Sequence, residues 1–178
     1  FHLLTESFDD YAEGHNFLGL IALRARNLDE AIDEFEKTVS IGRRLFPKRV
    51  RKDCYWSDLD TRPFIRGLGN LSVAMNRAGR YEDALACTDR LEHECGLVER
   101  AVAHRGPIYI NLAEWERAVE TSRKRQDLDP SEGLVVAFAE YELGHRKAAL
   151  VALFHAAMNH PFGARVAAFP LLPRFGYS

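Results

Sequence analysis

The sequence contains little cysteine. Of its 178 residues only Cys54, Cys87 and Cys95 are cysteines, and no two of them form a Cys-x-x-Cys pair. The count is odd and the spacing matches no zinc-binding pattern, so we expect neither a disulfide framework nor a structural metal, and no cofactor. Three small apolar side chains in a reducing compartment are the simplest interpretation, which makes the cytoplasm the expected location.

Long apolar runs are also missing. The longest uninterrupted apolar stretch, residues 148–154, has seven residues, whereas a helix that crosses a membrane needs about twenty. The pattern of a basic, then apolar, then small-residue leader is not present in these residues either. We therefore expect no membrane span within this stretch of chain.

Neither charge nor catalytic motifs point to a particular chemistry. The formal net charge is −2, from 24 basic and 26 acidic residues, which argues against a global field that attracts polyanions. A glycine-rich phosphate loop, an HExxH motif and a Gly-x-Ser-x-Gly motif are all absent. The sequence nominates no catalytic residue, and we expect the protein not to be an enzyme.

The chain does contain helical periodicity and an internal repeat. Four short segments, starting at residues 26, 79, 113 and 144, each begin with a helix-ending turn and reach an alanine at the same place. An alanine there lets two antiparallel helices approach closely, and stacked hairpins of this kind bury a continuous core. The four alanines are separated by 53, 34 and 31 residues, and they are Ala31, Ala84, Ala118 and Ala149.

The chain resembles the tetratricopeptide repeat (TPR) family, whose period is 34 residues. The first three repeats carry the family's characteristic residues, namely Leu18, Gly19, Leu28, Ala31 and Phe35, then Leu71, Gly79, Tyr81 and Ala84, then Gly106, Tyr109, Trp115, Ala118 and Pro130. The second repeat departs from the pattern at Ser72 and Thr88, where the family usually has glycine and phenylalanine. The fourth repeat matches only at Gly144 and Ala149.

The resemblance implies an all-α fold, a right-handed superhelical array of antiparallel helix hairpins with about four hairpins and a short C-terminal cap. We expect a single TPR-like domain over residues 1–178. Its repeats would occupy roughly residues 12–45, 65–98, 99–130 and 131–160, with an insertion at 43–61 and a cap and tail at 161–178.

The resemblance also implies a binding surface, because the first helix of every TPR hairpin faces a concave groove. Arginine and asparagine dominate the matching positions, and these side chains suit acidic groups and peptide backbone, although they are equally typical of ordinary exposed helix positions. We predict a non-catalytic scaffold that binds a protein or peptide, with acidic partners favoured. The predicted groove residues are Asn16, Arg24, Arg66, Asn70, Asn76, Arg77, Arg100, His104, Asn111 and Tyr141.

One TPR subclass clamps the C-terminal carboxylate of its ligands with five side chains. Asn70, Arg100 and His104 lie at three of those positions. Asn16 and Leu20 stand where the subclass has lysine and asparagine. A two-carboxylate clamp without its lysine is incomplete, so we do not expect the full clamp here.

The insertion contains the strongest charge asymmetry of the chain. Six cations fall within residues 43–52, namely Arg43, Arg44, Lys48, Arg49, Arg51 and Lys52, and no acid lies between them. A solvated helix end is the simplest interpretation, since cations are favoured at helix C-termini. Binding of an acidic protein segment is one alternative. Another is nucleic-acid binding, with Phe46, Tyr55 and Trp56 stacking on bases, which the net acidic charge makes the less expected of the two.

The end of the insertion has the features of a helix start. Thr61 is placed to cap the next helix with its hydroxyl, and Pro63 falls in the first turn, where no amide partner is lost. Trp56 and residues 61–66 also resemble a subgroup of TPR proteins, which adds no activity to the prediction.

The C-terminal segment is apolar and interrupted by prolines. Repeat arrays need an element that covers their last apolar face, and we expect residues 163–169 to form a short capping helix. The remaining tail is an alternative interface, through which two copies would form a structural homodimer. The apolar residues of the whole segment 161–177 include Phe162, Val166, Phe169, Leu171, Leu172 and Phe175.

Overall fold

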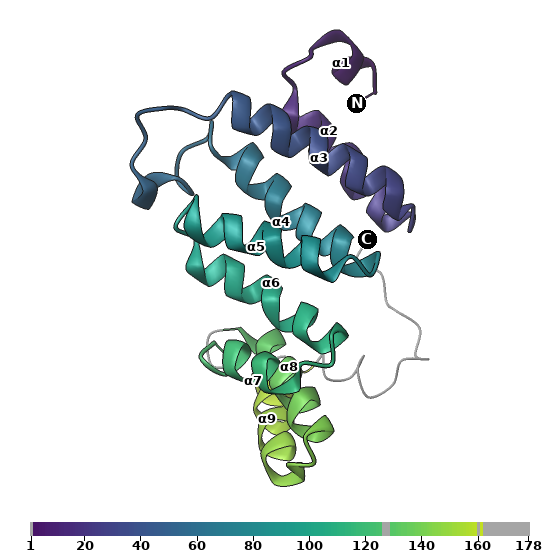
Figure 1. Ribbon diagram of the computed structural model, residues 1–178, viewed down its shortest axis with the longest axis vertical. Helices are drawn as coiled ribbons and strands as arrows, with labels where there is room; N and C mark the ends of the chain where they lie inside the picture. The colour runs from purple at the N-terminus through teal and green to yellow at the C-terminus, as the bar shows by residue number, and fades with distance from the viewer. Residues whose placement is uncertain (1, 126–128, 160, 162–178) are drawn as a thin grey trace. The chain divides into compact units, whose positions relative to one another are not determined.

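The chain is built from helices. The computed structural model describes residues 2–125, 129–159 and 161, and throughout this part of the chain the regular secondary structure is helical, without strands (Figure 1). It divides into two compact units, Phe1–His104 and Arg105–Ser178, which are described separately. The predicted all-α fold of antiparallel helix hairpins is confirmed. The capping helix predicted at 163–169 and the apolar tail lie outside the described residues.

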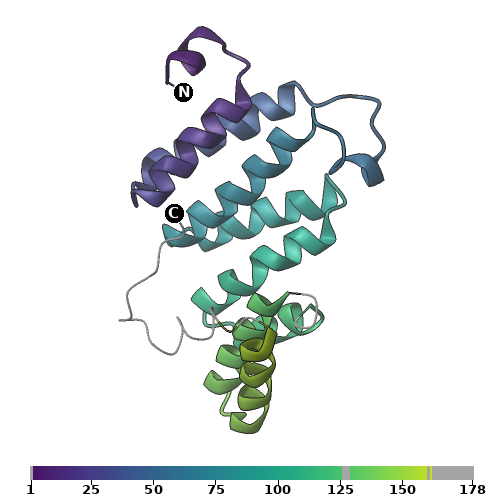
Figure 2. The same cartoon turned by 180° about the vertical axis from the view of Figure 1, so that it is seen from behind.

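The first unit is a stack of hairpins. Helix α2 packs on α3, α3 on α4 and α4 on α5, so that helices adjacent in the chain are adjacent in space (Figure 1). The insertion between α3 and α4 is a loop with one 3-10 turn (Figure 2). The elements are α1 (His2–Ser7), α2 (Ala12–Arg24), α3 (Leu28–Arg44), η1 (Lys52–Cys54), α4 (Arg62–Arg77), α5 (Tyr81–His93) and the first part of α6 (Val98–Asn111).

The same turn closes all four helix pairs. A residue with positive φ ends the first helix, and the next residue donates its backbone N–H to the carbonyl five residues earlier, as in a Schellman motif. Gly79 and Gly144 adopt this conformation without strain, whereas Arg26 and Ala113 carry a Cβ into it. The four bonds, each 2.9–3.0 Å long, are Asn27 to Ala22, Arg80 to Met75, Glu114 to Tyr109 and His145 to Glu140.

The helices of the first unit cross closely at small residues. Ala31 and Ala84 are fully buried. Ser72, which replaces the usual glycine, donates its hydroxyl to the Ala84 carbonyl at 3.1 Å, so this buried hydroxyl has a hydrogen-bond partner. Gly19 faces the Phe35 ring, where a Cβ would come within 2.6 Å of the ring carbon Cε1. Close packing therefore accounts for the small residues of the repeat pattern.

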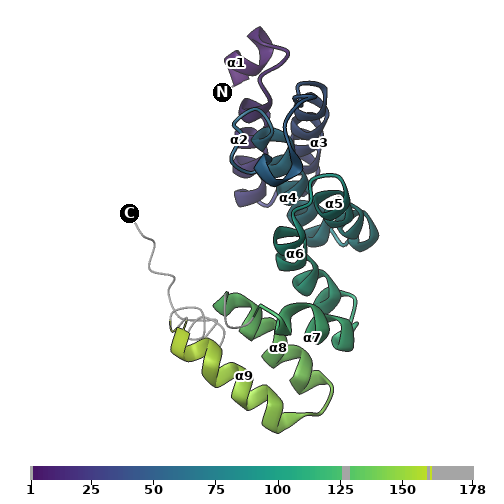
Figure 3. The same ribbon diagram turned by 90° about the vertical axis from the view of Figure 1, so that its left-hand side faces the viewer.

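The second unit contains the end of α6 together with α7 (Trp115–Arg123), α8 (Pro130–Glu142) and α9 (Arg146–Asn159). Helix α7 packs on α8, and α8 and α9 form an antiparallel hairpin (Figure 3). Ala118 and Ala149 are buried, whereas Phe138, Leu150 and Phe154 are exposed. Among the residues that the structure describes, no helix is both long enough and apolar enough to cross a membrane.

Candidate functional site

Two polar contacts join the first helices of the first two hairpins. Arg66 and Asn70 lie one turn apart on the same face of α4. The Nη1 atom of Arg66 lies 2.9 Å from Oε1 of Glu13 on α2. One turn further along, Asn70 donates its Nδ2–H to Oδ1 of Asn16, also on α2, at 2.8 Å. The polar stripes of α2 and α4 therefore form one surface.

The first turns of α6 extend this surface. A Cβ on Gly69 of α4 would lie 3.1 Å from Nε2 of His104, so the glycine leaves room for the imidazole. Burial lowers the pKa of His104, and the positive charge of Arg100, one turn earlier, lowers it further. His104 is therefore neutral at pH 7. We refer to Glu13, Asn16, Arg66, Asn70, Arg100 and His104 as the α2–α4–α6 face.

This face carries excess positive charge. Burial lowers the pKa of Arg100, and the charge of Arg66 contributes to the same shift, so the two guanidinium groups repel each other. Arg66 has Glu13 as its counter-ion. Arg100 makes no ion pair with any residue in the described part of the chain. An added anion would relieve this repulsion.

The insertion borders the α2–α4–α6 face. The guanidinium carbon of Arg100 lies 3.6 Å from the centroid of the Trp56 ring, and that of Arg62 lies 6.0 Å from it. Arg62 also donates its Nε–H to the Trp56 carbonyl at 3.1 Å. At the other side of the loop, Lys52 donates its ammonium to the His93 carbonyl at 2.9 Å. The insertion is thus held between α4 and the turn before α6, and Trp56 remains 40% exposed.

Thr61 has a different role from the one predicted. It precedes α4, and Pro63 lies in the first turn as expected. Its hydroxyl, however, makes no bond to the helix and instead lies against the carbonyl oxygens of Tyr55 and Asp58. The reason is conformational: Thr61 already has helical backbone angles, whereas a capping residue is usually extended. Thr61 closes the insertion loop.

The structure brings five of the ten predicted groove residues together, namely Asn16, Arg66, Asn70, Arg100 and His104. Asn16 is only 6% exposed, and its carbonyl is occupied by Asn70. Four others lie elsewhere in the fold: Arg24 at the C-terminal end of α2, Asn76 and Arg77 at that of α4, and Asn111 at that of α6. Tyr141 is on α8 in the second unit, where Asn111 also belongs.

Sequence reasoning missed Glu13, and it considered Trp56 as a residue that stacks on bases, not as a partner of Arg100. Glu13 lies one turn before Asn16, on the same stripe of α2, so its position in the repeat was a usable signal. Trp56 lies 44 residues before Arg100 in the sequence. No repeat position relates the two residues, and only the path of the insertion places them together.

Most of the basic cluster in the insertion is already engaged. Arg43 lies 3.6 Å from the Glu94 carboxylate, Arg44 pairs with Asp10, and Arg51 lies 2.6 Å from Asp53. Lys48 and Arg49 are exposed and make no ion pair within the described residues.

The aromatic residues of the insertion are also partly engaged. The Phe46 ring packs edge-on against Tyr55 and Phe64, at centroid distances of 4.9 and 5.4 Å. Tyr55 is half-buried. Of the three aromatic residues predicted to stack on bases, Trp56 is the exposed one, and the guanidinium of Arg100 stacks on its ring.

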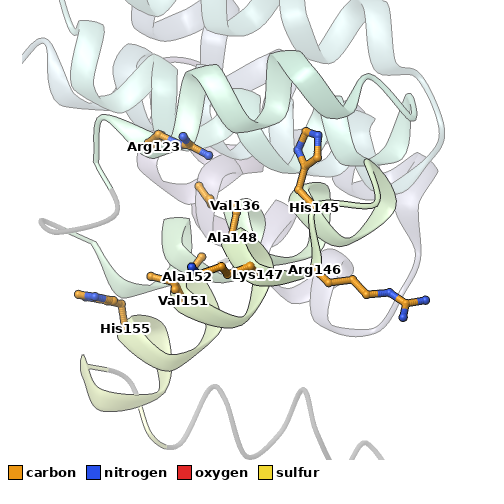
Figure 4. Close-up of a pocket in the computed structure, with 9 residues that line it drawn as sticks. All are labelled: Arg123, Val136, His145, Arg146, Lys147, Ala148, Val151, Ala152 and His155. Atoms are coloured by element: carbon orange, nitrogen blue, oxygen red, sulfur yellow. The ribbon is translucent and has the colours of Figure 1, made fainter.

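The second unit has a pocket of about 700 Å³ between α7, α8 and α9 (Figure 4). Two side chains of its lining, Arg123 and His145, bind the buried carboxylate of Glu140, the latter at 2.7 Å. Arg146 and His155 point away from the floor at opposite ends of the pocket (Figure 4). The floor is apolar, formed by Val136, Ala148, Val151 and Ala152. No set of three His, Cys, Asp or Glu side chains in residues 2–125 and 129–159 is placed to hold a metal ion.

Comparison with known proteins adds little to this geometry. No protein-family model matches the chain, and no curated protein matches it by sequence. Among solved structures the chain is similar to MamA AMB-1, crystallised in space group P212121, with 15% identity over 94% of this chain and 100% of that one. The TM-score is 0.47. A superposition of this quality does not define a function.

Proposed function

We propose that this protein is a non-catalytic scaffold of the TPR type and that the α2–α4–α6 face binds an acidic segment of a partner protein. One observation carries the proposal: Arg66 and Arg100 lie on different helices, repel each other, and have only the Glu13 carboxylate as a described counter-ion. The repeat residues and the four identical hairpin turns support the scaffold assignment.

An acidic side chain of the partner would bind between the two arginines. A guanidinium presents a planar fork of donors that matches a carboxylate, and the partly buried surroundings strengthen the pair. Glu13 and the incoming carboxylate would share or compete for Arg66. Asn70, which is half-buried beside Arg66, is placed to bind the peptide backbone.

A binding measurement with a matched control tests this proposal. The probe is a fluorescein-labelled decapeptide of alternating glutamate and glycine, followed by fluorescence anisotropy. We expect the double variant Arg66→Ala with Arg100→Ala to bind about 10-fold more weakly, a loss of about 1.4 kcal/mol. The helical circular dichroism spectrum should not change.

The control removes the same charge from the exposed cations without ion pairs, in the double variant Lys48→Ala with Arg49→Ala. We expect less than a twofold change in affinity. Equal losses in both double variants would show that the probe responds to net charge alone and would overturn the assignment of the face.

The other two functions considered from the sequence are not proposed here. Arg43, Arg44, Arg51 and Lys52 already have partners within the protein, which weakens the case for a nucleic-acid site. The homodimer through the C-terminal tail stays a prediction, because the tail lies outside the described residues.

A further inference from the structure

We infer that the anion recognised by the α2–α4–α6 face is a phosphorylated serine or threonine of the partner, bound by Arg62, Arg66 and Arg100 beside Trp56. This inference rests on the proposed function, and it adds Arg62 and the insertion to the site. The reasons are that Arg62 and Arg100 share the Trp56 ring, that the charge of Arg66 acts on Arg100, and that the three charges exceed their described counter-ions.

The three arginines lie in the first two turns of two helices. Arg62 is the first residue of α4, and Arg66 follows one turn later on the same face, where side chains four residues apart are neighbours. Arg100 lies in the first turn of α6. Trp56 connects the two helices, because the guanidinium groups of Arg62 and Arg100 both lie against its ring.

The charges at this point are not balanced within the described residues. Arg66 is paired with Glu13, but Arg62 donates only to a backbone carbonyl and Arg100 only stacks on Trp56. Asp58, the nearest acid of the insertion to Trp56 in sequence, accepts the backbone N–H of Asp60 at 2.9 Å and forms no ion pair within the described residues. Counted over Arg62, Arg66, Arg100 and the paired Glu13, three positive charges and one negative charge leave an excess of two.

This excess fits a phosphoryl group better than a carboxylate. A phosphorylated side chain carries a charge of about −1.5 to −2 at pH 7 and has three strong acceptor oxygens. A carboxylate would neutralise only one of the two uncompensated charges and offers two oxygens. Three guanidinium forks around one anion match the phosphoryl group in both charge and number of acceptors.

Trp56 is a positioning residue in this arrangement. A guanidinium stacked on an indole ring is held in one orientation and is partly shielded from water, which prepares Arg100 for an anion before the partner arrives. The insertion, held by Lys52 and closed by Thr61, supplies this ring. The insertion therefore sets which anion the face selects.

Three labelled peptide pools test the inference on the full chain. They are degenerate nonapeptides that differ only at the central residue, which is serine, glutamate or phosphoserine. We expect the phosphoserine pool to bind at least 10-fold more tightly than the glutamate pool and the serine pool not to bind measurably. In the Trp115→Phe variant Trp56 is the sole tryptophan, and its emission should change on binding of phosphoserine.

Substitutions at Arg62 separate the inference from the proposed function. Arg62→Gln should bring the affinity for phosphoserine close to that for glutamate and leave glutamate binding within about twofold. Arg62→Lys keeps the charge and should restore part of the difference, which guards against a misfolded variant. Lys48→Gln is the matched control and should change neither affinity.

The outcomes are distinct. Equal affinity for glutamate and phosphoserine, both above serine, would overturn the phosphoryl inference and leave the acidic-segment function intact. Equal affinity for all three pools, or no binding by a fully helical protein, would overturn both.

Discussion

Glu34 in the first unit and Glu132 in the second are both withdrawn from water, the first partly and the second fully, and their surroundings act on them in opposite ways. In the first unit, Glu34 accepts hydrogen bonds from Nδ1 of His15 at 2.8 Å and from the ammonium of Lys37 at 2.5 Å. Burial alone would raise the pKa of Glu34, but these two partners outweigh it and hold the pKa below its ordinary value. In the second unit, Glu132 is 2% exposed, and its Oε2 makes no hydrogen bond within the described residues. Burial, aided by Asp129, raises its pKa.

The packing of side chains also differs between the two units. In the first unit a large ring packs against a glycine, where the Phe35 ring lies 2.6 Å from the position of a Cβ on Gly19. In the second unit the α8–α9 crossing joins small residues, with Ala156 at 3.1 Å from a Cβ on Gly133, and Phe138, Leu150 and Phe154 are exposed. The first two repeats lie in the first unit and form its filled core, whereas the α8–α9 hairpin of the fourth repeat leaves large side chains exposed.

Overfilling the helix crossings should produce the largest difference between the units. Ala84→Leu places three extra carbons where the native residue is 0% exposed, and we expect a loss of about 1–3 kcal/mol in the free energy of unfolding. Ala149→Leu, at 7% exposed, should cost less than half as much because the side chain can turn outward. Urea unfolding measures both. Equal losses would contradict the contrast in packing.

Substitutions of the two glutamates should change the free energy of unfolding in opposite directions and by an intermediate amount. At pH 7 we expect Glu34→Gln to destabilise by about 1 kcal/mol, because it removes charge-assisted hydrogen bonds, and Glu132→Gln to stabilise by about 1 kcal/mol, because no buried charge remains.

The pH dependence follows from the direction of each shift. The stability that Glu34 contributes is present above its ordinary pKa and is lost as the pH falls through its lowered value. Glu132 acts in the other direction: stability present below its ordinary pKa is lost as the pH rises through its raised value. Urea titrations at pH 4 and 7 should show that the difference in stability between each glutamine variant and the unchanged protein is smaller at pH 4. Effects of equal sign at pH 7 would contradict the comparison.

The smallest effect is expected on the outer face of α9. Leu150 is 67% exposed, so Leu150→Ser should change the stability by no more than about 0.5 kcal/mol. The matched variant Leu91→Ser, in the core of the first unit, should cost several times more, since Leu91 is fully buried. Thermal unfolding followed by circular dichroism compares them. A comparable loss at Leu150 would mean that this face is covered in the protein.

Much of the fold was predictable because its determinants are local. The turn residues and the alanines five positions later recur along the chain, and each turn forms the same backbone hydrogen bond. Repeat position also located Arg66, Asn70, Arg100 and His104, because equivalent positions on successive hairpins face the same way. Asn16 was placed correctly along α2, but its burial depended on Asn70, a partner 54 residues away.

The sequence by itself determined where helices begin and end, which residues lie at their crossings, and which polar stripes the first helices share, because these properties depend on residues within a few turns of one another. Tertiary structure decided the path of the insertion, the stacking of Trp56 on Arg100, the pairing of Arg66 with Glu13 and the opposite treatment of Glu34 and Glu132. Each of these outcomes depends on how much water and which charges surround a side chain, and only the packed helices set those surroundings.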